Sequence, residues 1–151
     1  MRPTVLQDLE KVTFKYPNKV AFADLKEEFS FSNLLNCSKK IGSYIAQRVS
    51  THNPVIVYME KRAYNIPAFL GAAYAGCFYV PIDSQMPPER INLILDTLHP
   101  SIIIFDEVTK KNVDAISNGI YTVNYRDAVS CEIDQEKLDH IRLNAKSTDL
   151  L

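Results

Sequence analysis

The hydrophobic positions of this chain recur with two different periods, which indicates that helices and strands alternate along it. Apolar residues spaced three and four apart predict amphipathic helices, whereas short continuous runs rich in β-branched residues predict strands buried on both faces. The predicted helices cover residues 5–16, 33–48, 65–75, 87–98 and 108–116. The predicted buried strands cover residues 55–59, 77–82, 101–105 and 120–123.

Local signals refine this pattern. Two short strands at residues 20–23 and 29–31, separated by charged residues, predict an antiparallel hairpin. Ser32 is expected to cap the helix that follows, and Gly76 is expected to end the helix at residues 65–75. Pro81 lacks a backbone N–H, so its strand is expected to lie at a sheet edge or to end there.

The alternation of strands and helices predicts the α/β class: a layered, mainly parallel sheet with flanking helices and an early antiparallel hairpin. Residues 1–123 are expected to form this unit. From residue 124 to residue 151 the chain is polar and weakly patterned, which predicts a linker with one helical turn. A length of 151 residues fits one ordinary domain with a real core.

Composition narrows the possible partners. Seventeen basic and eighteen acidic residues give a net charge of -1, which provides no broad positive field for nucleic acid. No apolar run is long enough for a signal peptide or a membrane span. Three widely spaced cysteines fit neither a disulfide framework nor a zinc site. We therefore expect a cytoplasmic protein with no nucleic-acid partner and no membrane span.

Candidate chemistry is sparse. The four glycines form no phosphate-binding cluster. Asp24, Asp83 and Asp106 each directly follow a predicted strand, and ligands of open α/β sheets collect beyond the carboxyl ends of strands. The three aspartates either bind a cation such as Mg²⁺, in a stand-alone binding or signalling module, or serve as ordinary turn and cap residues. No residue is predicted to be catalytic or to bind a cofactor.

Three stretches resemble the adenylation domains of AMP-forming enzymes. Those domains carry a segment that reads L-x-x-x-K-A-G-x-x-Y-V-P-I/L-D, and residues 70–83 read LGAAYAGCFYVPID. Residues 87–91 (PPERI) are similar to the family's P-x-E-R-I run, and residues 29–34 (FSFSNL) stand in the place of its L-T-Y-x-E-L. Tyr74 replaces the usual lysine and Asn33 the usual glutamate. The motif residues expected to serve the architecture are Gly76, Tyr79, Val80, Pro81, Asp83, Glu89 and Arg90.

The resemblance is to the N-terminal part of amino-acid adenylation enzymes, most similar to D-alanine:carrier-protein ligases and next to the adenylation domains of nonribosomal peptide synthetases. It implies an enzyme that uses ATP and Mg²⁺ to form an aminoacyl adenylate and then loads a phosphopantetheine carrier protein. Residues 148–151 (TDLL) resemble the D-L-A-Y that precedes the family's phosphate loop. The chain is therefore expected to bind no cofactor and to be inactive without the missing C-terminal part.

Overall fold

The computed structural model describes residues 4–146, 148 and 149. Leu150 and Leu151, the end of the TDLL segment, lie outside the described residues. In chain order the elements are α1 (Val5–Lys15), β1 (Val20–Ala23), β2 (Glu28–Ser30), α2 (Phe31–Ala46), β3 (Pro54–Met59), α3 (Asn65–Tyr74), β4 (Phe78–Asp83), α4 (Pro88–Leu98), β5 (Ile102–Phe105), α5 (Lys110–Ser117), β6 (Tyr121–Asn124), α6 (Tyr125–Ala128) and α7 (Gln135–Asn144).

Four strands form a parallel sheet in the order β4-β3-β5-β6, and β1 and β2 form a separate antiparallel hairpin. The α/β class with a parallel sheet and an early hairpin is therefore confirmed. β4, which contains Pro81, lies at an edge of the sheet as expected from the missing N–H. Its register places Val57 opposite Pro81 and Met59 opposite Asp83.

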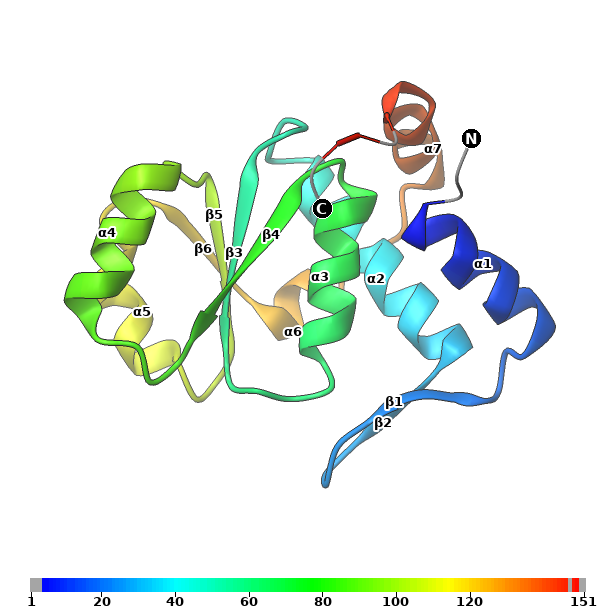
Figure 1. The fold of residues 1–151 in the computed structure, drawn as a ribbon, viewed down its shortest axis with the longest axis horizontal. Coiled ribbons are helices and arrows are strands. Elements are labelled where there is room, and N and C mark those ends of the chain that lie inside the picture. The colour runs from blue at the N-terminus through cyan, green and yellow to red at the C-terminus, as the bar shows by residue number, and fades with distance from the viewer. Residues whose placement is uncertain (1–3, 147, 150–151) are drawn as a thin grey trace.

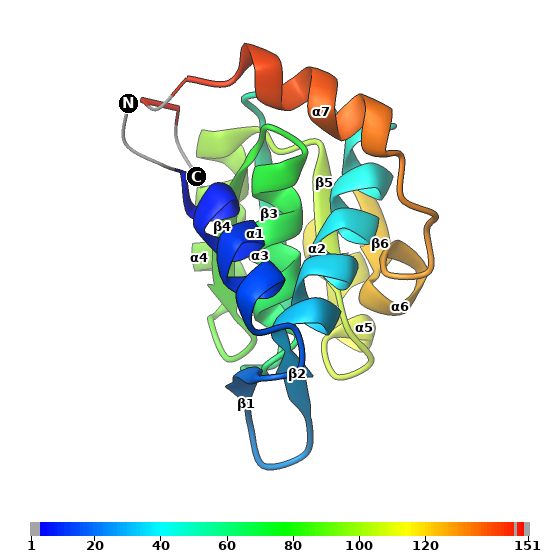
Figure 2. The same ribbon diagram turned by 90° about the vertical axis from the view of Figure 1, so that its right-hand side faces the viewer.

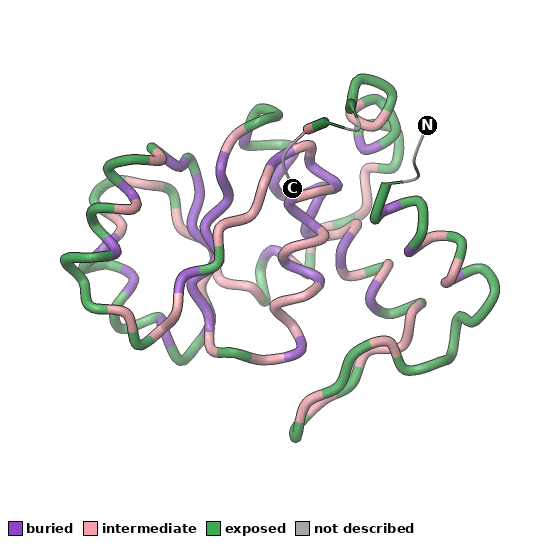
Figure 3. Tube along the Cα trace, in the orientation of Figure 1, coloured by how far each residue is buried: buried purple, intermediate pink, exposed green. Residues whose placement is uncertain are grey.

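Helices cover both faces of the sheet (Figure 1), α4 and α5 on one face and α2 and α3 on the other. Every residue of β3 is buried, and its side chains alternate between the two layers. Val55 and Val57 pack toward α2 and α3, whereas Ile56 and Tyr58 pack toward α4 and α5. α1 adds an outer layer on α2 and α3 through Leu6 and Leu9 among others. Figure 3 shows the burial concentrated in the central strands.

The start of α2 differs from the prediction. The hydroxyl of Ser30 accepts a hydrogen bond from the backbone N–H of Asn33 at 3.1 Å, so Ser30, and not Ser32, caps the helix. Phe31 was assigned to the strand because Phe29, Ser30 and Phe31 alternate in polarity, but it already begins the helix. The reason is that Ser30 ends the hairpin in an extended conformation, which frees its side chain to bond three residues ahead.

The segment predicted as a linker with one helical turn contains two helices, α6 and α7. α7 lies across one end of α2 and α3 (Figure 2). Leu138, the buried residue of the ten-residue helix α7, packs against these helices. Its weak apolar pattern explains why the sequence did not predict it. Among residues 4–146, 148 and 149, no helix has the length and apolar character needed to cross a membrane.

Candidate functional site

The three strand-end aspartates converge on one loop, Glu60–Tyr64, which connects β3 to α3. Asp106 is 5% exposed, and both of its carboxylate oxygens are engaged. Oδ2 accepts from the backbone N–H of Glu60 at 2.8 Å and from the Tyr64 hydroxyl at 2.6 Å. Oδ1 accepts from the backbone N–H groups of Val108 and Thr109 at 3.0 and 2.9 Å. Asp106 thus joins the loop after β3 to the start of α5.

Burial raises the pKa of Asp106, but hydrogen bonds from Tyr64 and from the backbone at Thr109 and Glu60 outweigh it, so the pKa lies below the ordinary value. The Thr109 hydroxyl adds a second link between the ends of β3 and β5. Its hydroxyl has one hydrogen, and the shortest contact is to the carbonyl oxygen of Tyr58 at 2.7 Å. The same hydroxyl accepts from the backbone N–H of Asp106 at 3.1 Å. The ends of β3 and β5 are therefore joined both by the Asp106 carboxylate and by the Thr109 hydroxyl.

Asp24 performs the corresponding role for the hairpin. Within the hairpin turn it accepts from the backbone N–H groups of Lys26 and Glu27 at 2.7 and 3.0 Å. From the β3–α3 loop it accepts from Arg62 Nε at 2.7 Å and from the Ala63 N–H at 2.8 Å. The Arg62 guanidinium, followed by these backbone donors, holds the pKa of Asp24 well below its usual range. Arg62 also contacts Glu27 at 3.1 Å. The hairpin is thus anchored to the sheet by charge-assisted hydrogen bonds.

Asp83 is the most exposed of the three. It accepts from the Gln85 N–H at 2.9 Å and pairs with Lys61 at 3.1 Å. Because the Lys61 side chain is 85% exposed, water and salt screen this pair strongly. The backbone bond from Gln85, followed by the bond from Lys61, lowers the pKa of Asp83.

The structure does not bring Asp24, Asp83 and Asp106 together as a metal ligand set. Each one faces a different set of donors, and within the described ranges no group of three or more His, Cys, Asp or Glu residues is placed to hold a metal ion. Of the aspartates that the sequence singled out, Asp24 and Asp106 anchor the Glu60–Tyr64 loop, whereas Asp83 meets it only through the exposed Lys61 side chain. Their partners Arg62 and Tyr64 were not predicted, because the loop meets Asp24 and Asp106 across 38 to 46 residues of sequence. Thr109 was not predicted either, although it lies only three residues after Asp106.

Gly76 and Tyr79, two of the motif residues, lie at positions that shape the fold. Gly76 ends α3 with a left-handed φ of 70°, and a Cβ there would come within 2.8 Å of both Thr51 and Ile141. The Tyr79 ring stacks on Phe69 with centroids 4.5 Å apart. The remaining positions are Val80 packed in the layer under α4 and α5, Pro81 exposed on β4, and Glu89 and Arg90 exposed in the first turn of α4.

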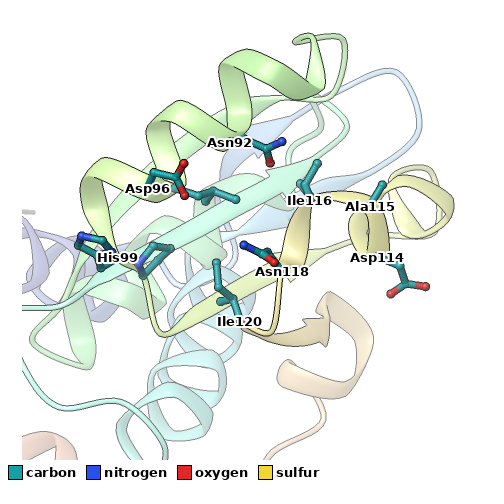
Figure 4. A pocket seen from close by; sticks show the side chains of 10 residues that line it. Asn92, Asp96, His99, Asp114, Ala115, Ile116, Asn118 and Ile120 are labelled. Atoms are coloured by element: carbon teal, nitrogen blue, oxygen red, sulfur yellow. The ribbon is translucent and has the colours of Figure 1, made fainter.

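A hollow of about 610 Å³ lies between α4 and α5, at the amino ends of β5 and β6 (Figure 4). Leu95, Pro100, Ile116 and Ile120 contribute apolar lining, while polar residues such as His99 stand at the rim. The hollow is at the opposite end of the strands from the aspartates. Figure 4 also shows the Asp114 carboxylate directed away from it. This hollow therefore has no geometric connection with the anchored loop.

A parallel sheet with helices on both faces and an added hairpin defines an α/β domain of the doubly wound kind. The chain belongs to the AMP-binding enzyme family, whose model matches residues 9–149. Among curated relatives it is similar to the D-alanine–D-alanyl carrier protein ligase of Staphylococcus haemolyticus, with 35% identity over 64% of this chain and 19% of the relative. The ligase of the same name from Lacticaseibacillus casei is 29% identical over 69% of this chain and 21% of the relative.

Solved structures share the fold. A nonribosomal peptide synthetase matches 97% of this chain and 14% of its own with a TM-score of 0.76 and 19% identity. An O-succinylbenzoate coenzyme A synthetase from Bacillus subtilis, solved with ATP and magnesium ion, matches 83% of this chain and 34% of its own with a TM-score of 0.72 and 14% identity. The chain thus corresponds to an N-terminal part of adenylating enzymes. It spans about one fifth of the length of the curated relatives it matches.

Proposed function

We propose that this chain is the N-terminal part of an AMP-forming ligase that activates an amino acid, with D-alanine favoured, and loads it onto a phosphopantetheine carrier protein. The observation that carries the proposal is the family match over residues 9–149, together with curated relatives that are named D-alanine–D-alanyl carrier protein ligases. In this assignment residues 1–123 form the α/β subdomain and residues 124–151 lead toward the phosphate-loop segment. A cytoplasmic location suits a reaction that consumes ATP.

In the proposed reaction the amino-acid carboxylate attacks the α-phosphate of Mg·ATP, and the carrier thiol then takes the acyl group from the adenylate. Catalysis of this kind depends on positioning and on stabilising charge at phosphorus. The part of the enzyme described here supplies a scaffold. Asp24 and Asp106 form hydrogen bonds with the protein's own Glu60–Tyr64 loop, which supports a structural role for them and no direct part in the chemistry.

The same proposal holds that the chain alone does not catalyse the reaction. ATP and Mg²⁺ are the cofactors of the whole enzyme, and the remainder of the enzyme and the carrier protein are its partners. Asp24 and Asp106 already accept hydrogen bonds on both carboxylate oxygens, so neither offers an open coordination set for Mg·ATP. Nucleotide binding is therefore assigned to the remainder of the enzyme.

A chimera tests this function. The 96-residue stretch that matches the Staphylococcus haemolyticus ligase replaces its counterpart in that ligase, and ATP–pyrophosphate exchange is measured with D-alanine and with L-alanine. We expect exchange that prefers D-alanine from the chimera and none from the isolated chain. A chimera that melts cooperatively but shows no exchange with any amino acid contradicts the proposal.

Thermal melting of the isolated chain separates the alternatives. A ligand that binds only the native state raises the melting temperature. Because the proposal assigns the nucleotide site to the remainder of the enzyme, we expect no shift with Mg·ATP and D-alanine. A shift that requires ATP contradicts the assignment of the nucleotide site to the remainder of the enzyme. A shift with Mg²⁺ alone supports the cation-binding module at Asp24, Asp83 or Asp106 instead.

A further inference from the structure

The strand order places a topological switch point between β3 and β5. From β3 the chain passes to β4 on one side, and it then crosses over to β5 on the other side. The loop after β3 leads to α3 on one face, whereas the loop after β5 leads to α5 on the opposite face (Figure 1). In doubly wound sheets the crevice that opens where these loops diverge is where ligands bind, and phosphate groups are common there.

In this protein a negative charge already stands where the two loops diverge. The Asp106 carboxylate lies between the two loops and accepts four hydrogen bonds, two on each oxygen. The Glu60 N–H and the Tyr64 hydroxyl come from the β3–α3 loop, and the Val108 and Thr109 N–H groups come from the start of α5. The donors therefore come from both of the diverging loops.

The charge of Asp106 is stabilised by dipoles. In residues 4–146, 148 and 149, no lysine or arginine forms an ion pair with this carboxylate, and its nearest donors are uncharged. Backbone N–H groups and hydroxyls that converge in this way also hold free anions in other proteins. The donors around Asp106 thus form an anion cradle whose anion is supplied by the protein itself.

We propose that the switch point of this sheet is an anion-binding cradle filled by the protein's own Asp106, which stands where the anionic group of a ligand would bind. The carboxylate joins the loops after β3 and β5 and keeps these donors from phosphates and small carboxylates. Removal of the side chain opens the cradle to a carboxylate of its own size, such as formate. This inference does not depend on the proposed ligase activity.

Chemical rescue of Asp106→Ala tests the cradle. Melting temperatures are measured in sodium formate and in sodium chloride at equal ionic strength, for the wild type, Asp106→Ala and the control Asp83→Ala. We expect Asp106→Ala to melt lower than the wild type and to recover in formate by about 3–6 °C at ten times the dissociation constant. The wild type and Asp83→Ala are expected to respond to formate as they do to chloride.

A rescue by formate no larger than that by chloride overturns the proposal, as does an equal formate effect on Asp83→Ala. If Asp106→Ala does not fold in buffer, refolding yields in formate and in chloride serve as the readout, and equal yields overturn it. Asp106→Asn is the second variant, because it keeps the volume and turns an amide NH₂ toward donors. We expect it to be destabilised and insensitive to formate, and wild-type stability of this variant contradicts the cradle.

Discussion

Arg142 of α7 grips Glu10 of α1 with two hydrogen bonds, from Nη1 to Oε2 at 2.7 Å and from Nη2 to Oε1 at 3.0 Å. The Tyr74 hydroxyl of α3 donates to the same carboxylate at 2.8 Å. Tyr74 is the residue that replaces the lysine common in the resembling motif, and here it serves a contact between three helices. A planar guanidinium paired in this bidentate way is well oriented and half-buried, which makes it stronger than an open surface pair.

Replacement of Arg142 is expected to loosen α7. Arg142→Met leaves Glu10 half-buried with Tyr74 as its remaining partner, and we expect a loss of about 1–2 kcal/mol in the free energy of unfolding. Urea unfolding measures the loss, and amide exchange is expected to be faster in α7 than elsewhere. Arg126→Met is the control, since Arg126 is exposed. Equal stability of the two variants is incompatible with the role assigned to the ion pair.

The cap of α2 gives a prediction with an internal control. Ser30→Ala removes the acceptor for the Asn33 N–H and is expected to cost about 1 kcal/mol of stability. Ser32→Ala lies within the first turn and is expected to change the stability by less than about 0.5 kcal/mol. Chemical denaturation of both variants checks the order. A larger cost at Ser32 contradicts the cap seen in the structure.

Asp24 is expected to control the attachment of the hairpin. Asp24→Asn weakens the bonds to Arg62 and Ala63, so amide exchange in β1 and β2 is expected to rise more than exchange in the central sheet. Glu28→Gln is the control, because Glu28 is an exposed acid of the same hairpin. Hydrogen exchange read by mass spectrometry compares the two. Unchanged hairpin protection in Asp24→Asn rules out the anchor.

The lowered pKa of Asp106 predicts that the protein loses stability in acid. Its pKa in the folded state lies below the ordinary value of about 3.9, so the unfolded state takes up a proton first as the pH falls. The stabilisation is therefore fully present well above about pH 4 and is lost as the pH falls through the folded-state pKa. The free energy of unfolding, measured in urea between pH 3 and 6, is expected to change less with pH for Asp106→Asn than for the wild type. Identical slopes argue against a lowered pKa.

The sequence predicts those elements in which neighbouring residues share the same kind of environment, so that burial leaves a regular pattern along the chain. β3 and β5 are unbroken apolar runs because both faces of the sheet are covered, and the strand-end position of Asp106 follows from the same pattern. Contacts between distant segments leave no such trace. The Tyr64 bond to Asp106 and the Arg142 bond to Glu10 join residues 42 and 132 positions apart. α7 was missed because only Leu138 is buried on it, while Ile141 is half-buried and Leu143 is exposed, which gives a weak apolar pattern.

The Glu10 to Arg142 contact also bears on the order in which the chain folds. It closes a loop of 132 residues, and loop-closure entropy for that length costs about 4 kcal/mol. The pairings of β3 with β4 and β5 close much shorter loops, so we expect them to form first and α7 to dock after the folding transition state. Arg142→Met should then speed unfolding and leave the folding rate almost unchanged. Stopped-flow kinetics that show slower folding instead would place α7 in the folding nucleus.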